Sequence, residues 1–203
     1  MAQTLPRPKH EELLATAVRL FREKGYHATS MQDLAEAVGI QRGSLYHYIA
    51  AKEDLLWEIM ERAMTALRAA VEAEIALPGP AAERLRRAVA AHLAVAAAIP
   101  DELTILHVEL KALSPRRRTA MVAMRDAYER LFRGLIEDGV GAGAFQRVDA
   151  KAAGFAILGA CNWFTQWYDP RGPMDHARFA EIFTRLFLNG LDHGPAGTAE
   201  DRP

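Results

Sequence analysis

Side chains that can contact nucleic acid crowd into one short stretch of the chain, AEAVGIQRGSLYHYIAAKEDL, at Ala35–Leu55. Arginine and glutamine can pair with guanine and adenine edges, and hydroxyl groups can donate to phosphate oxygens. A glycine lets the protein backbone come close to the DNA. The free amides at the start of a helix can bind a phosphate, and a lysine there adds a positive charge. The predicted DNA contacts in this stretch are therefore Gln41, Arg42, Gly43, Ser44, Tyr46, His47 and Lys52, and Ser30, just before it, is a further one.

Two short helices joined by a tight turn would present these groups. Apolar residues at i, i+3, i+4 and i+7 predict a first helix with Ser30 as its N-cap and Gly39 at its end. A second short helix is expected over residues 41–48, with Leu45 and Ile49 facing inward. This arrangement is typical of a helix-turn-helix unit, whose second helix enters the major groove of DNA.

The overall charge does not identify a partner, because 25 basic and 26 acidic residues give a net charge of −1. Residues 1–56 are also neutral, with seven residues of each sign. Between Ala37 and Lys52, however, there are two cations, one histidine and no acidic residue, and such segregation favours a DNA-reading face. From composition alone, a solvated helix face in a bundle is an equal alternative.

The remaining pattern is helical throughout. Longer helices are predicted over residues 8–24, 52–77, 81–99, 101–113, 115–138, 150–168 and 174–191. No segment shows the strict alternation of a half-buried strand. We therefore expect an all-α fold of about nine helices. Residues 1–54 would be a three-helix DNA-binding domain, residues 55–191 a helical ligand-binding and dimerisation domain, and residues 192–203 a disordered tail.

Composition sets further bounds. A chain of 203 residues with 50% hydrophobic residues can bury a sizeable core. The single cysteine, Cys161, excludes an intrachain disulfide and is expected to be an inert, packed thiol. We see no apolar stretch of the signal-peptide or membrane-spanning kind. The expectation is a cytoplasmic protein with no membrane partner.

The segment LFREKGYHATSMQDLAEAVGIQRGSLYHYIAAKEDLLWEIM, Leu20–Met60, resembles the N-terminal domain of the tetracycline-repressor family. The resemblance implies a dimeric, all-helical repressor that grips a palindromic operator and is released by a small molecule. By position, it assigns phosphate contacts to Ser30, Tyr46 and Lys52, and base contacts to Gln41, Arg42, Gly43 and His47. Ile49 stands where an aromatic residue is usual, which we expect to alter core packing rather than the choice of DNA sequence.

The C-terminal half carries a narrower resemblance. NWFTQWYDPRGP, followed by a helix ending LFLNGL, is similar to the tails of acyl-CoA-responsive repressors of fatty-acid, steroid or aromatic-acid degradation. Thr165 departs from that motif at a position usually held by an aromatic residue. The resemblance implies an acyl-CoA effector and no cofactor. The expected effector-binding residues are Leu106, Leu110, Met124, Tyr128, Phe155, Trp163, Trp167, Arg116 and Arg117.

Several of these residues also have a plainer interpretation. The arginines beside Pro115 could form a solvated turn, and the two tryptophans could be packing residues. The last two helices are predicted to pair with their copies in a homodimer, through Gly159, Phe179, Ile182, Phe183 and Leu186.

Other functions would require different residues. A repressor of an efflux gene that responds to cationic or aromatic compounds would need buried acids, for which Glu102 and Glu109 are the candidates. No acid, base or nucleophile cluster indicates an enzyme, and no His and carboxylate spacing indicates a metal site. His92 and His107 are expected to be polar residues at helix edges.

Overall fold

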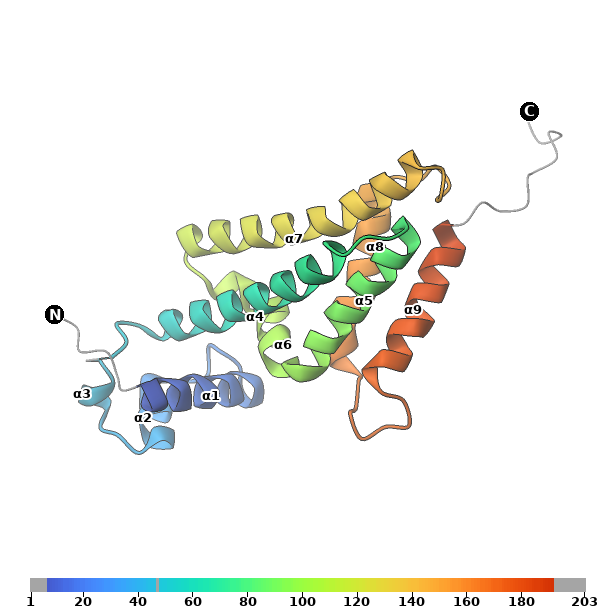
Figure 1. The fold of residues 1–203 in the computed structure, drawn as a ribbon. Helices are drawn as coiled ribbons and strands as arrows, with labels where there is room; N and C mark the ends of the chain where they lie inside the picture. Colours follow the sequence, from blue (N-terminus) through green and yellow to red (C-terminus); the bar gives the residue numbers. More distant parts are fainter. Residues whose placement is uncertain (1–6, 47, 192–203) are drawn as a thin grey trace, which may run out of the picture. The chain divides into compact units, whose positions relative to one another are not determined.

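The structure, a computed structural model, describes residues 7–46 and 48–191 (Figure 1). Over these residues the chain forms nine α-helices, two short 3-10 helices and no strand, which confirms the predicted all-α fold. The helices are α1 (Arg7–Lys24), α2 (Met31–Val38), α3 (Arg42–Leu45), α4 (Lys52–Ile75), α5 (Ala81–Ala98), α6 (Pro100–Val108), η1 (Glu109–Ala112), α7 (Pro115–Gly141), α8 (Ala150–Trp163), η2 (Phe164–Gln166) and α9 (His176–Leu191).

The chain divides into two compact units. The first comprises the residues up to Ala66 together with Ala98–Arg125, and the second comprises Leu67–Ala97 together with the residues from Asp126 onward. The first unit therefore contains α1 to α3, α6 and the first halves of α4 and α7. The second contains α5, α8, α9 and the remainder of α4 and α7. The expected domain boundary at residue 54 remains a prediction.

Leucines at helical spacing form the core of the first unit. Leu13 of α1, Leu34 of α2, Leu45 of α3 and Leu55 of α4 are each fully buried. Their burial holds α2 and α3 against α1, and each contributes about 1.5–3 kcal/mol relative to an exposed side chain. The unit is therefore assembled around the short helices that the sequence predicts as the reading element.

Three predicted helices are shorter than expected, and the one predicted over 150–168 ends as α8 at Trp163, where the 3-10 helix η2 follows. The helix predicted over 41–48 is α3, with four residues; it ends at Leu45, and its C-cap Tyr46 still has right-handed helical dihedral angles. Gly43 and the aromatic residues that follow it have lower helix propensity than Ala or Leu, so a second turn gains little. The helix predicted over 101–113 is α6, whose last turn tightens into the 3-10 helix η1.

The second unit has a core rich in aromatic residues. Phe132 and Phe164 are fully buried, and Tyr128 packs edge to face on Phe132 with ring centroids 5.6 Å apart. Cys161 lies in this core, as predicted, and burial raises the pKa of its thiol to about 12. No single described helix is both long and apolar enough to cross a bilayer, and α5 with Pro100–Ala112 meets that test only when the two are counted together.

Candidate DNA-binding and effector sites

Helix α2 and the turn after it are fixed by their end residues. Ser30 is the N-cap, as predicted: its hydroxyl accepts a 3.0 Å hydrogen bond from the Asp33 N–H, and Asp33 Oδ2 accepts one of 2.8 Å from the Ser30 N–H. This reciprocal pair is a capping box. Gly39 ends the helix in the left-handed region, with φ +72°, which costs glycine nothing. The turn therefore places α3 at a defined angle to α2.

Helix α3 has one buried side and one exposed side, as the reading-helix interpretation requires. Leu45 and Ile49 face the core, whereas Gln41, Arg42 and Tyr46 are exposed. The Arg42 guanidinium donates a 3.2 Å hydrogen bond to the Tyr46 hydroxyl and lies 5.7 Å from the centre of its ring. These two side chains are thus held together on the exposed side of α3, where both are accessible to a partner.

The other predicted contacts on this helix have clear surroundings. Ser44 is half-buried beside them. His47, a predicted base contact, lies outside the described residues. Gly43 is exposed, and a Cβ added to it would meet nothing within 4 Å. Packing within the protein therefore does not require glycine at position 43, which is consistent with a requirement set by an external partner.

Lys52 has a structural role that the sequence did not reveal. Its ammonium group donates a 2.6 Å hydrogen bond to the carbonyl oxygen of Tyr26, and another to the carbonyl oxygen of Thr29. It also lies 4.3 Å from the centre of the Tyr26 ring. Burial lowers the pKa of this lysine below its ordinary value. Two of its three N–H donors are thus used inside the first unit, and the predicted phosphate contact has one donor left.

The arginines at the start of α7 divide between two environments. Arg117 is bound by carboxylates of α4: its guanidinium lies 2.6 Å from Asp54 Oδ1 and 3.7 Å from Glu53 Oε1. These contacts anchor α7 to α4, and they compete with the predicted contact between Arg117 and an effector phosphate. Arg116 is exposed and keeps its side chain at the surface. Of the two, Arg116 is the better candidate for a polyanionic ligand.

The predicted apolar effector residues do not all share one unit. Leu106, Leu110 and Met124 belong to the first unit, where Leu106 is fully buried and the other two are half-buried. Tyr128 belongs to the second, where its hydroxyl makes a 2.8 Å hydrogen bond with His92 Nδ1. Burial raises the pKa of Tyr128 well above its ordinary value, so the hydroxyl stays protonated.

Two histidines expected at helix edges have buried nitrogens instead. His92 is fully buried beside Tyr128 and Phe132, so its predicted place at an edge is wrong. His107 has a buried Nε2 with no hydrogen-bond partner among the described residues. Burial, with a contribution from Arg125, lowers its pKa to about 4. The neighbours of His92 are mainly alanines, and those of His107 include several leucines. Apolar neighbours of this kind indicate a helix with little polar surface, and hence a buried histidine.

Glu129 adds a buried acid to the second unit. It is 8% exposed, and its Oε1 has no hydrogen-bond partner within the described part of the chain. Its Oε2 lies 3.6 Å from the Arg133 guanidinium, and Gly154 of α8 faces it. Nothing in the local sequence distinguishes this residue, since a glutamate on a long charged helix is usually solvated.

One face of α8 is apolar and uncovered. Phe155 is 55% exposed and Trp163 66% exposed, and Gly159 lies between them on the same face. These fractions place Phe155 and Trp163 on the surface rather than in an interior pocket, which disfavours their predicted effector role. On α9, Leu186 is 62% exposed, whereas Phe179, Ile182 and Phe183 are half-buried. Phe155 and Trp163 thus resemble the predicted interface residues.

Trp167 is partly exposed, but it is packed within an aromatic cluster. Its ring lies 5.2 Å from the rings of both Phe164 and Phe179. Edge-to-face contacts of this kind fix the end of α8 against α9. Among the described residues, no group of three His, Cys, Asp or Glu side chains could hold a metal ion.

Comparison with known proteins places these features in a family. Residues 13–59 match the family described as bacterial regulatory proteins, tetR family, and residues 78–191 match the tetracyclin repressor-like C-terminal domain. The chain is 30% identical over 186 residues to the HTH-type transcriptional repressor KstR2 of Rhodococcus jostii, covering 90% of this chain and 91% of that protein.

Two solved structures are similar over nearly their whole length. The TetR family regulator PfmR from Thermus thermophilus is 38% identical, with a TM-score of 0.82, covering 89% of this chain and 99% of that one. AibR in complex with isovaleryl coenzyme A and operator DNA is 26% identical, with a TM-score of 0.80, covering 88% of this chain and 97% of that one.

Proposed function

Because the chain belongs to the TetR family of bacterial regulatory proteins, we propose that it is a repressor that binds operator DNA as a homodimer and is released by an acyl-CoA. As a member of this family it is a transcriptional regulator rather than an enzyme.

The exposed side of α3 supports the assignment of the DNA contacts. Arg42 can form a bidentate contact with a guanine edge, and Gln41 can do so with an adenine. The Tyr46 hydroxyl and the amides at the start of α2 suit phosphate oxygens, which fix the register of the protein on the duplex. Gly43, with open space around it, would allow the helix backbone to approach the DNA closely.

The uncovered face of α8 supports a homodimer. Large apolar side chains exposed together are uncommon on monomeric proteins and mark interaction surfaces. Phe155, Trp163 and Leu186 have this character, and Gly159 would let two copies of α8 approach closely. A two-fold pair of reading helices about 34–36 Å apart would match one turn of DNA, and hence a palindromic operator.

The likeness to AibR, which was solved with isovaleryl coenzyme A and operator DNA, is the observation that carries the effector proposal. Within the first unit, the chain offers suitable chemistry for the acyl part: the half-buried Leu110 and Met124 are apolar and adaptable. The exposed Arg116 could meet a phosphate of the CoA moiety.

Release from DNA needs only a modest preference of the effector for one conformer. A coupling of about 1–3 kcal/mol between the two ligands changes operator affinity about 5- to 150-fold. Helix α4, with 24 residues, begins directly after the reading element and continues into the second unit. It is therefore the expected element through which the two ligands influence each other.

The test is a thermal-shift screen of the purified protein, followed by operator binding in the presence of each hit. The panel contains acyl-CoAs of increasing chain length, free CoA, the matching free acids and cationic dyes. A ligand that binds only the folded state raises the unfolding midpoint by mass action. We expect a shift with one class of acyl-CoA and none with CoA or free acid, and weaker operator binding with the same compound. A shift with cationic dyes alone would refute the acyl-CoA effector.

A further inference from the structure

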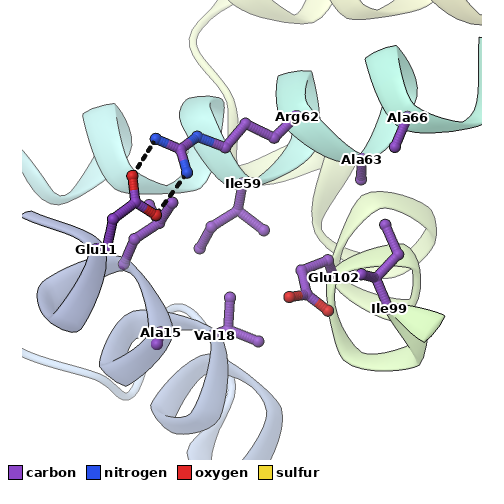
Figure 2. A pocket seen from close by; sticks show the side chains of 10 residues that line it. Glu11, Ala15, Val18, Ile59, Arg62, Ala63, Ala66, Ile99 and Glu102 are labelled. Atoms are coloured by element: carbon purple, nitrogen blue, oxygen red, sulfur yellow. Dashed lines mark hydrogen bonds and ion pairs between the residues drawn. The ribbon is translucent and has the colours of Figure 1, made fainter. Parts of the chain in front are cut away.

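A pocket of about 290 Å³ lies within the first unit, between α1, α4 and the start of α6 (Figure 2). None of its lining residues belongs to the exposed side of α3 or to the residues predicted to bind an acyl-CoA, whereas Glu102 is one of the two acids predicted for a cationic effector. Its lining residues are Glu11, Leu14, Ala15, Val18, Ile59, Arg62, Ala63, Ala66, Ile99 and Glu102. Seven of these ten are aliphatic, so the walls suit a hydrocarbon group.

Ion pairs hold the walls in place. At one end, Arg62 of α4 forms a bidentate pair with Glu11 of α1, with N···O distances of 2.8 and 2.9 Å (Figure 2). Arg62 also lies 2.7 Å from Glu58 on its own helix. Near α6, Arg22 of α1 makes a 2.9 Å contact with Asp101. The pocket is thus bounded by helices that are tied together on two sides, and its shape does not depend on apolar packing alone.

The opposite end of the pocket carries a carboxylate that has no counterion among residues 7–46 and 48–191. Glu102 of α6 is directed toward the middle of the pocket, facing Val18 (Figure 2). Within the described part of the chain, it forms no hydrogen bond or ion pair. A carboxylate facing apolar walls gains most from a cation that brings its own charge and hydrogen-bond donors.

The charged side chains of the pocket favour a positively charged ligand. The lining contains two carboxylates, Glu11 and Glu102, and one guanidinium, that of Arg62. This guanidinium is already shared between two glutamates, so it has little left to offer an anion. A fatty acid would bring a second negative charge to Glu102, and like charges at close range cost binding energy.

The volume limits the size of the ligand. A cavity of about 150 Å³ admits benzene, and drug-sized ligands occupy roughly 300–1,000 Å³. A pocket of 290 Å³ therefore suits one ring with a short chain, or an alkyl chain of similar size. A coenzyme A molecule is far too large for it.

We propose that this pocket is a second ligand site, which binds a small amphipathic monocation, with its ammonium group on Glu102 and its hydrocarbon part against Val18, Ile59 and Ala63. The site does not depend on the acyl-CoA effector. A ligand seated there would contact α1, α4 and α6 together, and so would stabilise their present arrangement in the unit that carries the reading helix.

The test uses three probes with one hydrocarbon skeleton and different charges: 4-phenylbutylamine, 4-phenylbutanol and 4-phenylbutyrate. Isothermal titration calorimetry on the full chain measures their affinities at neutral pH. We expect the amine to bind at least tenfold more tightly than the alcohol, and the acid to bind most weakly. Equal affinity for all three probes, or preference for the acid, would overturn the proposal.

Two variants locate the binding. Glu102→Gln removes the charge but keeps the shape, and should weaken amine binding at least tenfold. Its control is Glu61→Gln, an exposed glutamate of α4 outside the pocket, which should bind the amine like the original protein. Ala15→Leu narrows the pocket from α1 and should weaken the amine and the alcohol alike, whereas Ala120→Leu, on the exposed side of α7, should not.

The outcomes separate this site from the proposed effector site. In Glu102→Gln, the shift caused by an acyl-CoA should be unchanged even though amine binding is lost. If the amine binds Glu102→Gln and Ala15→Leu as tightly as the original chain, the assigned pocket is wrong. If no acyl-CoA binds any variant but the amine pattern holds, the effector proposal fails and this site stands.

Discussion

The ammonium group of Lys52 donates a 2.6 Å hydrogen bond to the carbonyl oxygen of Tyr26 and lies 4.3 Å from the centre of the ring of that same residue. The contact joins the first residue of α4 to the loop that connects α1 with α2. A lysine in this place therefore supports the architecture of the reading element, whatever it also does for DNA. Substitutions at position 52 must be interpreted in that light.

The first prediction separates these two roles. Lys52→Met keeps the aliphatic stem but removes the donors, which leaves two backbone carbonyls without their partner. A hydrogen bond to a charged group contributes about 1.5–3 kcal/mol, so we expect a loss of unfolding free energy of that size in urea titrations. The control is Lys24→Met, which removes an exposed ion pair with Asp33 and should cost at most about 1 kcal/mol.

The opposite result at Lys52 is also informative. Unchanged stability, with weaker operator binding and a salt dependence reduced by about one counterion, would mean that Lys52 acts on a phosphate and not on the fold.

The second prediction concerns Gly43. An alanine there meets nothing within 4 Å and improves helix propensity, so Gly43→Ala should raise the unfolding free energy by about 0.5–1 kcal/mol. If the α3 backbone lies against DNA, the added methyl group should nevertheless weaken operator binding about tenfold in fluorescence anisotropy. The control is Gly134→Ala on α7, which also has open space and should leave operator binding unchanged. Full operator affinity in Gly43→Ala would exclude a close approach of the helix backbone at this position.

The third prediction concerns acid stability. Burial lowers the pKa of His107 from its ordinary value of 6.5 to about 4, so the unfolded state takes up the proton more readily. The stability linked to this residue is therefore full above about pH 6.5 and is lost as the pH falls toward 4. His107→Leu should flatten the decline of unfolding free energy over this window, as measured by urea titrations at several pH values. If the unfolding free energy declines with the same slope in the original protein and in His107→Leu, the decline is caused by other groups.

The fourth prediction concerns assembly. Leu186→Glu places a charge on an exposed apolar face of α9, and burying it in an interface would be costly. We expect the dissociation constant of the dimer to rise about thirtyfold. This corresponds to a loss of about 2 kcal/mol of binding free energy, as for a residue at the centre of an interface. Analytical ultracentrifugation measures this directly, with Val122→Glu on α7 as a control. Monomers in both the original and the variant protein would contradict a homodimer built on this face.

Local sequence rules anticipated the helices well, because caps and apolar spacing are properties of short segments. Ser30 caps the start of α2 and Gly39 caps its end, as expected. The same rules overestimated the length of α3, because that length depends on how the residues after it fit into the core. The places of Lys52 and His92 were missed because both make contacts with residues more than twenty positions away. The exposure of Phe155 and Trp163 on α8 was not predicted for a similar reason. Whether an aromatic side chain is buried depends on which helices pack against it, and local sequence does not determine that.

Cys161 gives the protein a natural chemical reporter. The chain has one thiol, which is fully buried and has a pKa raised to about 12, so alkylating reagents reach it only when the surrounding helices separate. Its labelling rate therefore measures the opening frequency of the second unit. Any compound that stabilises this unit should slow the labelling, without a dye or an engineered cysteine. Acyl-CoA candidates could thus be ranked by mass spectrometry on the unmodified chain.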